Sequence, residues 1–235
     1  MNFKEKIEKL DKPTVFPPEN LLNEYTMSWK VPVSSLYFDN TVNAPTFFSK
    51  KDVDKFMDIC SNRGTNYYGD IDLCLYNALK DYPIQNKEVA IMGSETPWYE
   101  SICLTYGGKP TTIEYNKIVT DDDRLNVMTV EEYDRNPKQF DMAFSISSFE
   151  HDGLGRYGDT LCPDGDLNAM KKMKNTIKKN GTMFLSVPYG QDELVWNAHR
   201  IYGHLRFPLL IEGWVILREY SLTTNPERLF VLKNI

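Results

Sequence analysis

Short apolar runs alternate with amphipathic stretches along residues 89–187. The run at residues 89–92 is apolar throughout and is followed by a glycine, which predicts a buried strand. Apolar side chains then recur every four residues up to Gly107, a spacing typical of one face of a helix. Thr96 is the expected N-cap of this helix and Pro97 its expected first residue. The pattern therefore predicts a strand, a tight turn and a helix.

The same alternation continues to the C-terminus. Further strands are predicted at residues 111–115, 125–130, 140–146, 182–187, 214–220 and 229–233. One helix is expected to begin at Asp70, and another to follow the N-cap Asp166 and to end at Asn180 and Gly181. Alternating strands and helices imply a doubly wound parallel sheet of the α/β class. The last two strands, joined through residues 223–226, are predicted to form an antiparallel hairpin.

Residues 1–66 differ from the rest of the chain in their pattern. Five prolines interrupt any long element, while scattered aromatic residues such as Trp29 and Phe47 provide apolar surface to bury. We therefore expect an N-terminal cap or extension at residues 1–66 and a Rossmann-like domain at residues 67–235. The cap is expected to pack on that domain or to cover a pocket in it.

Composition excludes several classes of partner. The chain of 235 residues carries 27 basic and 33 acidic side chains, a net charge of −6, which predicts no binding to nucleic acid or an anionic membrane. No apolar run approaches the ~20 residues of a membrane helix, and the charged N-terminus lacks the apolar stretch of a signal peptide. The four cysteines lack CxxC spacing, so we expect a cytoplasmic protein with no metal site.

A polar, glycine-bearing loop follows the strand predicted at residues 140–146. It places Glu150, His151 and Asp152 close in sequence to Arg156. In an open parallel sheet, ligands bind beyond the carboxyl ends of the strands, so this loop is a candidate site. The alternative is a solvated acidic loop, since Gly and Asp are ordinary turn formers.

Two features of the first strand–helix unit predict a nucleoside ligand. Gly93 lies at the start of a helix, where free N–H groups favour a polar or anionic ligand. Glu114, 21 residues further on, ends the second strand, where a carboxylate accepts both ribose hydroxyl protons and disfavours a 2′-phosphate. Pro97 and Trp98 replace the small residues that a pyrophosphate needs, which favours a cofactor without phosphates. The alternative is a plain turn with an exposed Glu114.

The chain resembles a family catalogued as a domain of unknown function and related to the class I S-adenosylmethionine-dependent methyltransferases. The resemblance lies in the segments VAIMGSETPWYE, TTIEYN, FDMAFSISSFEHDGLGRYGD, KKNGTMFLSVP and NAHRIYG. It runs from about residue 89 to the end of the chain. It implies a seven-stranded Rossmann-like sheet with an antiparallel last strand, and S-adenosyl-L-methionine as the cofactor.

The resemblance also implies roles for individual residues. Residues 93–98 would line the methionine part of the cofactor, Glu114 would hold the ribose, and residues 129–131 would flank the adenine. Ser147 would lie on the side of the transferred methyl group. The residues expected to contact the cofactor are Gly93, Ser94, Glu95, Thr96, Pro97, Trp98, Glu114, Tyr115, Asn116, Thr129 and Ser147.

Methyl transfer needs an in-line nucleophile and often a base. His151 and His199 carry the side chain whose ordinary pKa suits a base near neutrality, and their loops follow neighbouring predicted strands, so the two rings are expected to face one cleft. Asp152 or Glu150 is expected to orient an imidazole. A purely structural role is the alternative for His151, and His204 is expected at the surface. The residues expected to bind the acceptor are Arg156, Tyr157, Arg200 and Tyr202.

The expected acceptor is a hydroxylated small molecule, such as a sugar or a nucleotide-linked sugar. Its phosphates would pair with Arg156, Arg200 and Arg206. A divalent cation held by carboxylates such as Asp152, Asp164 and Asp166 is an alternative use of the same loop. Two other functions stay open: a catalytically degenerate methyltransferase fold that binds a partner or small ligand, and a less favoured dinucleotide-dependent oxidoreductase.

Overall fold

The computed structural model describes residues 14–42, 44–222 and 226–235. These residues divide into two compact units. The first, which we call the loop unit, comprises the described residues up to 42 together with Phe149–Lys171 and Pro188–Glu212. The second, the sheet unit, comprises Ala44–Ser148, Lys172–Val187 and Gly213–Ile235. The part of the predicted cap from residue 44 onward therefore lies in the sheet unit, and residue 66 is not a boundary between these two units.

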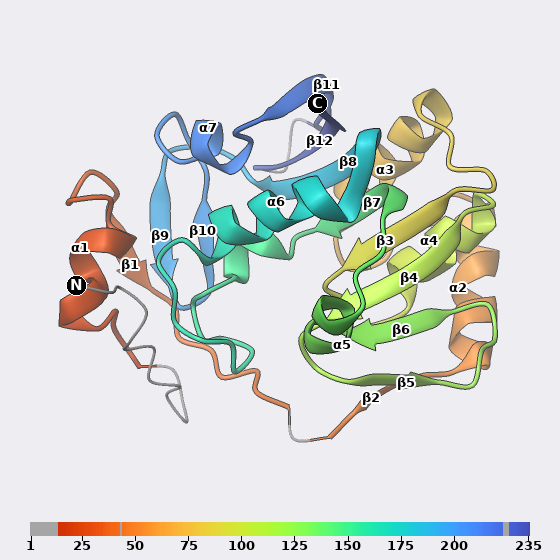
Figure 1. The fold of residues 1–235 in the computed structure, drawn as a ribbon, viewed down its shortest axis with the longest axis horizontal. Coiled ribbons are helices and arrows are strands. Elements are labelled where there is room, and N and C mark those ends of the chain that lie inside the picture. Colours follow the sequence, from red (N-terminus) through yellow and green to blue (C-terminus); the bar gives the residue numbers. More distant parts are fainter. Residues whose placement is uncertain (1–13, 43, 223–225) are drawn as a thin grey trace. The chain divides into compact units, whose positions relative to one another are not determined.

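Seven strands form one sheet in the sheet unit (Figure 1). In spatial order they are β11 (Trp214–Tyr220), β12 (Glu227–Asn234), β8 (Ile177–Pro188), β7 (Phe140–Ile146), β3 (Glu88–Met92), β4 (Lys109–Glu114) and β6 (Asn126–Thr129). β3 pairs in parallel with β4 and β7, and β6 and β8 extend this parallel set. The last strand, β12, is antiparallel to β11. The predicted α/β class and the predicted hairpin are confirmed, although its turn residues Thr223, Thr224 and Asn225 lie outside the described residues.

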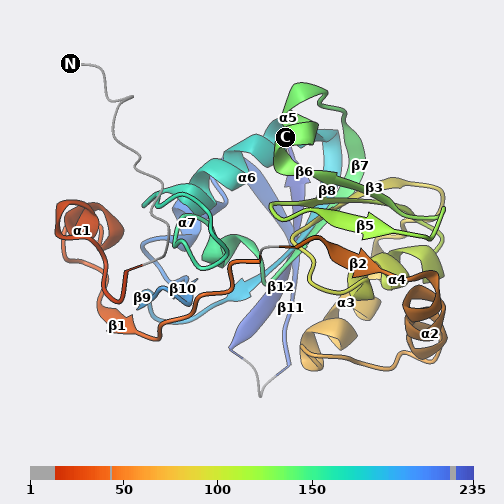
Figure 2. The ribbon, with the colours of Figure 1, turned by 90° about the horizontal axis from the view of Figure 1, so that it is seen from below.

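Helices cover both faces of this sheet (Figure 2). α3 (Asp70–Asp81) and α4 (Trp98–Thr105) share one apolar core with the sheet side chains Ile91, Phe144 and Phe184. α2 (Lys50–Ser61) packs against α4, while α5 (Val130–Arg135) and the C-terminal part of α6 (Gly165–Thr176) lie on the opposite face. The short strands β2 (Thr46–Phe48) and β5 (Ile118–Thr120) form a separate parallel pair. None of the helices in the described ranges is long and apolar enough to cross a bilayer.

The start of α4 differs from the prediction. The helix begins at Trp98, with Pro97 at the N-cap position and no side-chain cap, so the N-cap prediction for Thr96 was wrong. The carbonyl of Thr96 instead accepts from the backbone N–H of Trp98 at 2.7 Å. The chain therefore makes one further tight turn before the helix begins.

The end of α6 was also predicted wrongly. The helix stops at Thr176, and β8 begins directly at Ile177, which is fully buried and pairs with Phe140. Asn180, with a φ of +65°, and Gly181 lie inside the strand, beside a register shift in its pairing with β7. An Asn-Gly pair tolerates this left-handed backbone, so here the signal marks an irregularity in a strand rather than the end of a helix.

A three-stranded sheet forms the centre of the loop unit. β9 (Glu193–Trp196) pairs in parallel with β1 (Val33–Ser35) and antiparallel with β10 (His199–Ile201). Trp196 is fully buried, and its ring meets that of Tyr25, from α1 (Glu19–Tyr25), edge to face at 5.0 Å. The turn η1 (Phe149–His151) and the short helix α7 (Phe207–Leu210) complete the unit.

A buried ion pair fixes the loops of this unit. Asp166, predicted to cap α6, instead lies in the first turn of the helix, and its carboxylate accepts from Arg206 Nη2 at 2.6 Å and from Tyr202 Oη at 2.9 Å. Burial alone would raise the pKa of Asp166, but the charges of Arg200 and Arg206 hold it below its usual value. Asp166 is therefore a charged, fully buried group that depends on its partners.

Asp166→Asn should cost about 3–5 kcal/mol of unfolding free energy, because it leaves two buried guanidinium groups without their counter-ion. Urea denaturation would measure the loss. Asp164→Asn is the matched control: its side chain is 64% exposed and lies 3.7 Å from Arg206, so a change within about 0.5 kcal/mol is expected. Equal losses in the two variants would contradict this assignment.

Candidate active site

The turn between β3 and α4 requires a glycine at position 93. Gly93 has a φ of +70°, and a Cβ atom there would lie 2.3 Å from Ser148 Oγ and 3.8 Å from Glu114 Oε2. The backbone of this turn therefore runs closely against side chains from β4 and from the segment after β7. Only a residue without a side chain fits both the backbone conformation and the space.

Glu114, at the end of β4, is held by the backbone around it. Its Oε2 atom accepts from the Ser94 N–H at 3.0 Å, and its Oε1 atom accepts from the Asn116 N–H at 3.2 Å. Burial raises the pKa of the carboxyl, while these N–H groups counteract the rise. A carboxylate has about four lone-pair positions, so the two oxygens retain acceptor capacity for a ligand.

Behind this turn lies a second carboxyl that sequence reasoning missed. Glu100, in α4, is fully buried; its Oε1 atom accepts from Thr112 Oγ1 at 2.7 Å, and its Oε2 atom lies 3.1 Å from Ser94 Oγ. Burial raises the pKa of Glu100 to about 7. Position 100 is off the apolar face marked by Trp98 and Ile102, so the helical periodicity gave no sign that this residue is buried.

Trp98 is a core residue rather than an exposed lining residue of the turn. Its side chain is 3% exposed, and its indole Nε1–H donates to Asp72 Oδ1 at 3.0 Å. The hydroxyl of Tyr99 reaches the same oxygen at 3.3 Å, and the Asn66 N–H donates to the other at 2.8 Å. Three donors thus satisfy a buried aspartate at the start of α3, and Pro97 is buried as well. Among the predicted cofactor residues, Glu95, Thr96 and Tyr115 are exposed.

Two further predicted contacts occupy the ends of strands. Ser147, just after β7, has a φ of +49°, and its N–H donates to the Ser186 carbonyl at 3.0 Å. Thr129, at the end of β6, caps α5 by accepting from the Glu132 N–H. Its hydroxyl therefore already has a structural role.

Glu227, at the start of β12, is a further buried carboxyl that the sequence did not reveal. Its Oε1 atom accepts from Ser186 Oγ at 2.8 Å, and it also interacts with Ser147. Burial, with a contribution from the charge of Asp72, raises the pKa of Glu227 to about 7. A titratable group therefore lies beside the carboxyl ends of the central strands.

In the loop unit the structure brings the two predicted histidines together. The ring centroids of His151 and His199 are 6.4 Å apart. His151 Nδ1 lies 2.5 Å from the Ala198 carbonyl oxygen, which assigns the ring proton to Nδ1 and leaves the Nε2 lone pair free. Burial, followed by the charge of Arg156, lowers the pKa of His151 to about 3, and the same causes lower the pKa of His199. Both imidazoles are therefore neutral near pH 7.

Arg156 lies beside these histidines, and within the described residues its guanidinium group makes few hydrogen bonds. Its guanidinium group is 4.5 Å from the ring centroid of Phe38 and 5.0 Å from that of Tyr157, and Nη1 donates to the Ala198 carbonyl at 3.2 Å. The Nε atom is buried and has no hydrogen-bond partner in the part of the chain that the structure describes. This arrangement retains donors for an anionic ligand.

Arg200, Arg206 and Tyr202 serve the protein itself. Arg200 is 2% exposed and donates to the carbonyls of Glu150 and Asp152, while Tyr202 and Arg206 bind Asp166. The predicted contacts of these three residues with an acceptor therefore find no support in the structure. His204, by contrast, is at the surface as predicted, with its side chain 84% exposed.

Glu150, one of the two carboxylates expected to orient His151, lies near the ring but does not bond to its Nε2 atom. Glu150 Oε1 lies 3.8 Å from His151 Nε2, beyond hydrogen-bond distance. Burial raises the pKa of Asp152 well above its ordinary value. Within the described residues there is no group of three or more His, Cys, Asp or Glu side chains arranged to hold a metal ion. The alternative of a divalent cation at Asp152, Asp164 and Asp166 therefore gains no support.

A family model described as "Caenorhabditis protein of unknown function, DUF268" matches residues 86–233. The chain belongs to the DUF268 family. The match includes every candidate residue from Gly93 to Tyr202, whereas Asp72 lies before its start. Comparison with curated proteins gives no match.

Solved structures similar to this DUF268 member include methyltransferases. The Burkholderia thailandensis 1,6-didemethyltoxoflavin-N1-methyltransferase, solved with bound 1,6-didemethyltoxoflavin and S-adenosylhomocysteine, has a TM-score of 0.52 at 12% identity, covering 67% of this chain and 75% of that chain. An S-adenosylmethionine-dependent methyltransferase from Mesorhizobium loti has a TM-score of 0.48 at 8% identity, covering 68% and 97%. The first likeness shows that this DUF268 chain has the class I methyltransferase fold.

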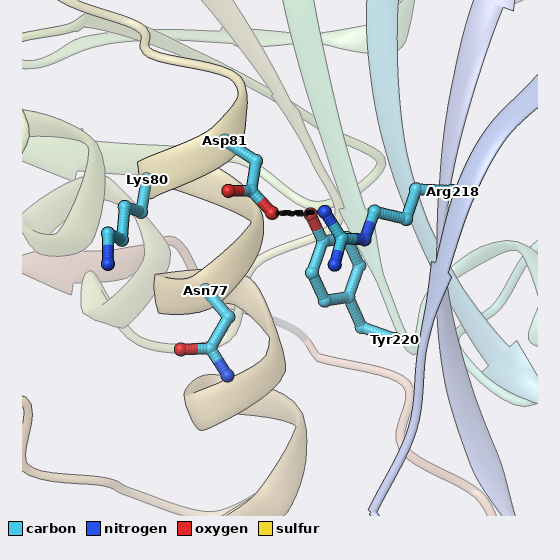
Figure 3. Close-up of a pocket in the computed structure, with 5 residues that line it drawn as sticks. All are labelled: Asn77, Lys80, Asp81, Arg218 and Tyr220. Atoms are coloured by element: carbon cyan, nitrogen blue, oxygen red, sulfur yellow. Dashed lines mark hydrogen bonds and ion pairs between the residues drawn. The ribbon is translucent and has the colours of Figure 1, made fainter.

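A hollow of about 280 Å³ on the sheet unit of this DUF268 protein lies elsewhere, between α3 and β11 (Figure 3). Its lining residues are Asn77, Lys80, Asp81, Arg218 and Tyr220. Asp81 Oδ2 accepts from Arg218 Nη1 at 2.8 Å and from Tyr220 Oη at 2.6 Å. These groups satisfy one another and join α3 to β11. The hollow contains none of the predicted site residues.

Glu227→Gln should flatten the pH dependence of stability in this DUF268 protein. Because folding raises the pKa of Glu227 from an ordinary 4.5 to about 7, its stabilising contribution is fully present below about pH 4.5 and lost as pH rises through about 7. One such proton changes the unfolding free energy by at most ~1.4 kcal/mol per pH unit.

Urea denaturation of both proteins at about pH 5, 6, 7 and 8 measures this slope. The exposed Glu95→Gln is the control and should leave the slope unchanged. A Glu227→Gln protein that loses stability as steeply as the wild type above about pH 5 contradicts the assignment.

Proposed function

We propose that this protein is an S-adenosylmethionine-dependent methyltransferase whose cofactor site lies at the carboxyl ends of β3 and β4. The observation that carries the proposal is the position of Glu114, with its carboxylate held by the Ser94 and Asn116 N–H groups beside the Gly93 turn. An acidic side chain at this place suits the two hydroxyls of a ribose. The class I fold is consistent with this function, since the similar Burkholderia thailandensis enzyme binds S-adenosylhomocysteine.

The residues fit the cofactor in a specific way. Glu114 would accept hydrogen bonds from both ribose hydroxyls, and the exposed backbone of Ser94, Glu95 and Thr96 would lie along the methionine part. Tyr115 and Asn116 follow Glu114 and would border the adenosine. When bound, the cofactor supplies an electrophilic methyl group on a sulfonium. A carboxylate that prefers free ribose hydroxyls argues against a cofactor with a 2′-phosphate.

For the acceptor we propose a hydroxyl group on a small molecule, such as a sugar or a nucleotide-linked sugar. The unused donors of Arg156 suit a phosphate or another anion, and Tyr157 offers a ring on which a sugar or base can stack. His199 is the better base, because His151 is held by the Ala198 carbonyl and its pKa falls to about 3. His199 would take the proton of the acceptor hydroxyl.

Glu114→Ala should weaken binding of S-adenosylhomocysteine by on the order of 1.5–3 kcal/mol, or about 10- to 150-fold, because it removes a charged acceptor of two hydrogen bonds. Isothermal titration calorimetry measures this change. Glu219→Ala, which changes an exposed glutamate of β11 outside the candidate site, is the control and should bind as the wild type does. Unchanged affinity in Glu114→Ala excludes the ribose assignment. Wild-type protein that binds NAD instead indicates an oxidoreductase, and binding without turnover indicates a degenerate enzyme.

His199→Ala should lower kcat by ~10²–10⁴-fold while leaving cofactor affinity nearly intact, as expected for loss of a general base. Turnover is followed as release of S-adenosylhomocysteine with a panel of sugar phosphates and nucleotide sugars. His151→Ala is the comparison, and it should mainly lower stability, by about 1 kcal/mol, through loss of the bond to Ala198. If His199→Ala keeps full turnover and only His151→Ala loses rate, then His151 is the base and His199 is the structural residue.

A further inference from the structure

The hydroxyl of Ser94 faces two oxygen atoms but has one proton. Ser94 Oγ lies 2.9 Å from the carbonyl oxygen of Thr96 and 3.1 Å from Glu100 Oε2. A hydroxyl donates one hydrogen bond and accepts others, whereas a carbonyl oxygen only accepts. If the hydroxyl donates to Thr96, the contact with Glu100 is a hydrogen bond only when Glu100 carries a proton on Oε2 and donates it to Ser94. Both contacts are satisfied by a neutral Glu100 and not by a charged one.

We infer that Glu100 is a positioning residue, whose protonated carboxyl holds the β3–α4 turn in the form that binds the cofactor. The inference rests on the cofactor site proposed above. The proton of Glu100 fixes Ser94 Oγ, the Ser94 hydroxyl fixes the Thr96 carbonyl, and the Ser94 N–H fixes Glu114 Oε2. In a glycine-rich turn several glycines give the backbone its shape, but Gly93 is the single glycine of the segment GSETPW. Here this chain of contacts holds the backbone of the turn instead.

The surroundings of Glu100 favour its neutral form. Glu114 faces it from the end of β4, and Cys103 lies close enough on the same helix for the charge of Glu100 to raise the pKa of that thiol. The charge of Glu114 favours the protonated carboxyl, whereas the buried thiol of Cys103 keeps its own proton. α2 meets α4 near Val53, whose carbonyl accepts from Ser101 Oγ at 3.4 Å, and β3 contributes the apolar Ile91 to the shared core. Full burial is the main cause that raises the pKa of Glu100 to about 7, and the charge of Glu114 adds a smaller contribution.

Loss of this proton has a specific consequence. A charged Glu100 draws the single Ser94 proton to Oε2, so the Thr96 carbonyl loses its side-chain donor and the turn loses one of its constraints. Cofactor binding is thus linked to uptake of one proton, with the transition near pH 7.

The test compares wild type, Glu100→Gln and Ser94→Ala by calorimetry with S-adenosylhomocysteine between about pH 5.5 and 8.5. The affinity of the wild type should be constant below about pH 7 and fall up to about tenfold per pH unit above it. The reason is that the fraction of protein with a protonated Glu100, the form that binds the cofactor, falls in that proportion. Glu100→Gln keeps a donor toward Ser94 and an acceptor toward Thr112, so it should bind with the low-pH affinity at every pH. Ser94→Ala should bind S-adenosylhomocysteine weakly, and its affinity should not fall as the pH rises above about 7. A Glu100→Gln protein with the wild-type pH profile overturns the inference.

A ligand-free measurement separates this inference from the proposed function. The infrared band of a protonated carboxyl, taken as wild type minus Glu100→Gln, should be present at about pH 6 and absent at about pH 8.5. Its absence at pH 6 overturns the inference whatever the protein binds. If the band is present at about pH 6 and absent at about pH 8.5 but the protein binds no S-adenosylhomocysteine, the result contradicts the proposed function instead. If Glu100→Gln does not fold, Ser94→Ala and the wild-type profile decide: a step that persists in Ser94→Ala also overturns the inference.

Discussion

The parallel pairing of β3 with β4 on one side and β7 on the other is the constraint on which the candidate cofactor site depends. Met92, the last residue of β3, pairs with Ile113 in β4 and with Ser145 in β7, so three segments far apart in sequence end at one edge. Only this register lets the Ser94 N–H reach Glu114 and lets Gly93 run against Ser148. A one-residue shift would turn the Glu114 side chain to the other face of the sheet, because strand side chains alternate.

Buried acids are stabilised in two different ways in the two units. In the loop unit, Asp166 stays ionised because Arg206 and Tyr202 supply donors to it and Arg200 adds a nearby positive charge. In the sheet unit, Glu100 and Glu227 are surrounded by hydroxyl groups and by other acids, and burial raises the pKa of each to about 7. The first arrangement makes a rigid element that is insensitive to pH near neutrality. The second makes groups whose charge changes in the physiological range.

The sequence predicted the sheet because strand and helix periodicities are local properties of the chain. The place of Glu114 at the end of a strand was predicted for a similar reason, since its interval from Gly93 reflects one strand–helix–strand unit. Glu100 and Glu227 were missed, because their partners Thr112 and Ser186 become neighbours only in the folded chain. In the loop unit, charge and sequence position suggested that Arg200 binds a ligand, whereas the structure shows it donating to backbone carbonyls. Where a side chain points is decided by tertiary packing, which no local pattern records.

The fit of Gly93 against Ser148 also bears on how related chains can diverge. A Cβ at position 93 would fall 2.3 Å from the hydroxyl of a residue 55 positions later, and a left-handed backbone adds a second penalty. Evolutionary change at position 93 therefore demands both a smaller residue at position 148 and a rebuilt turn. Homologues should divide into two groups at this pair of positions, and intermediates with a side chain at the first and serine at the second should be rare. The pair is a compact signature by which members that keep this turn can be told from those that have replaced it.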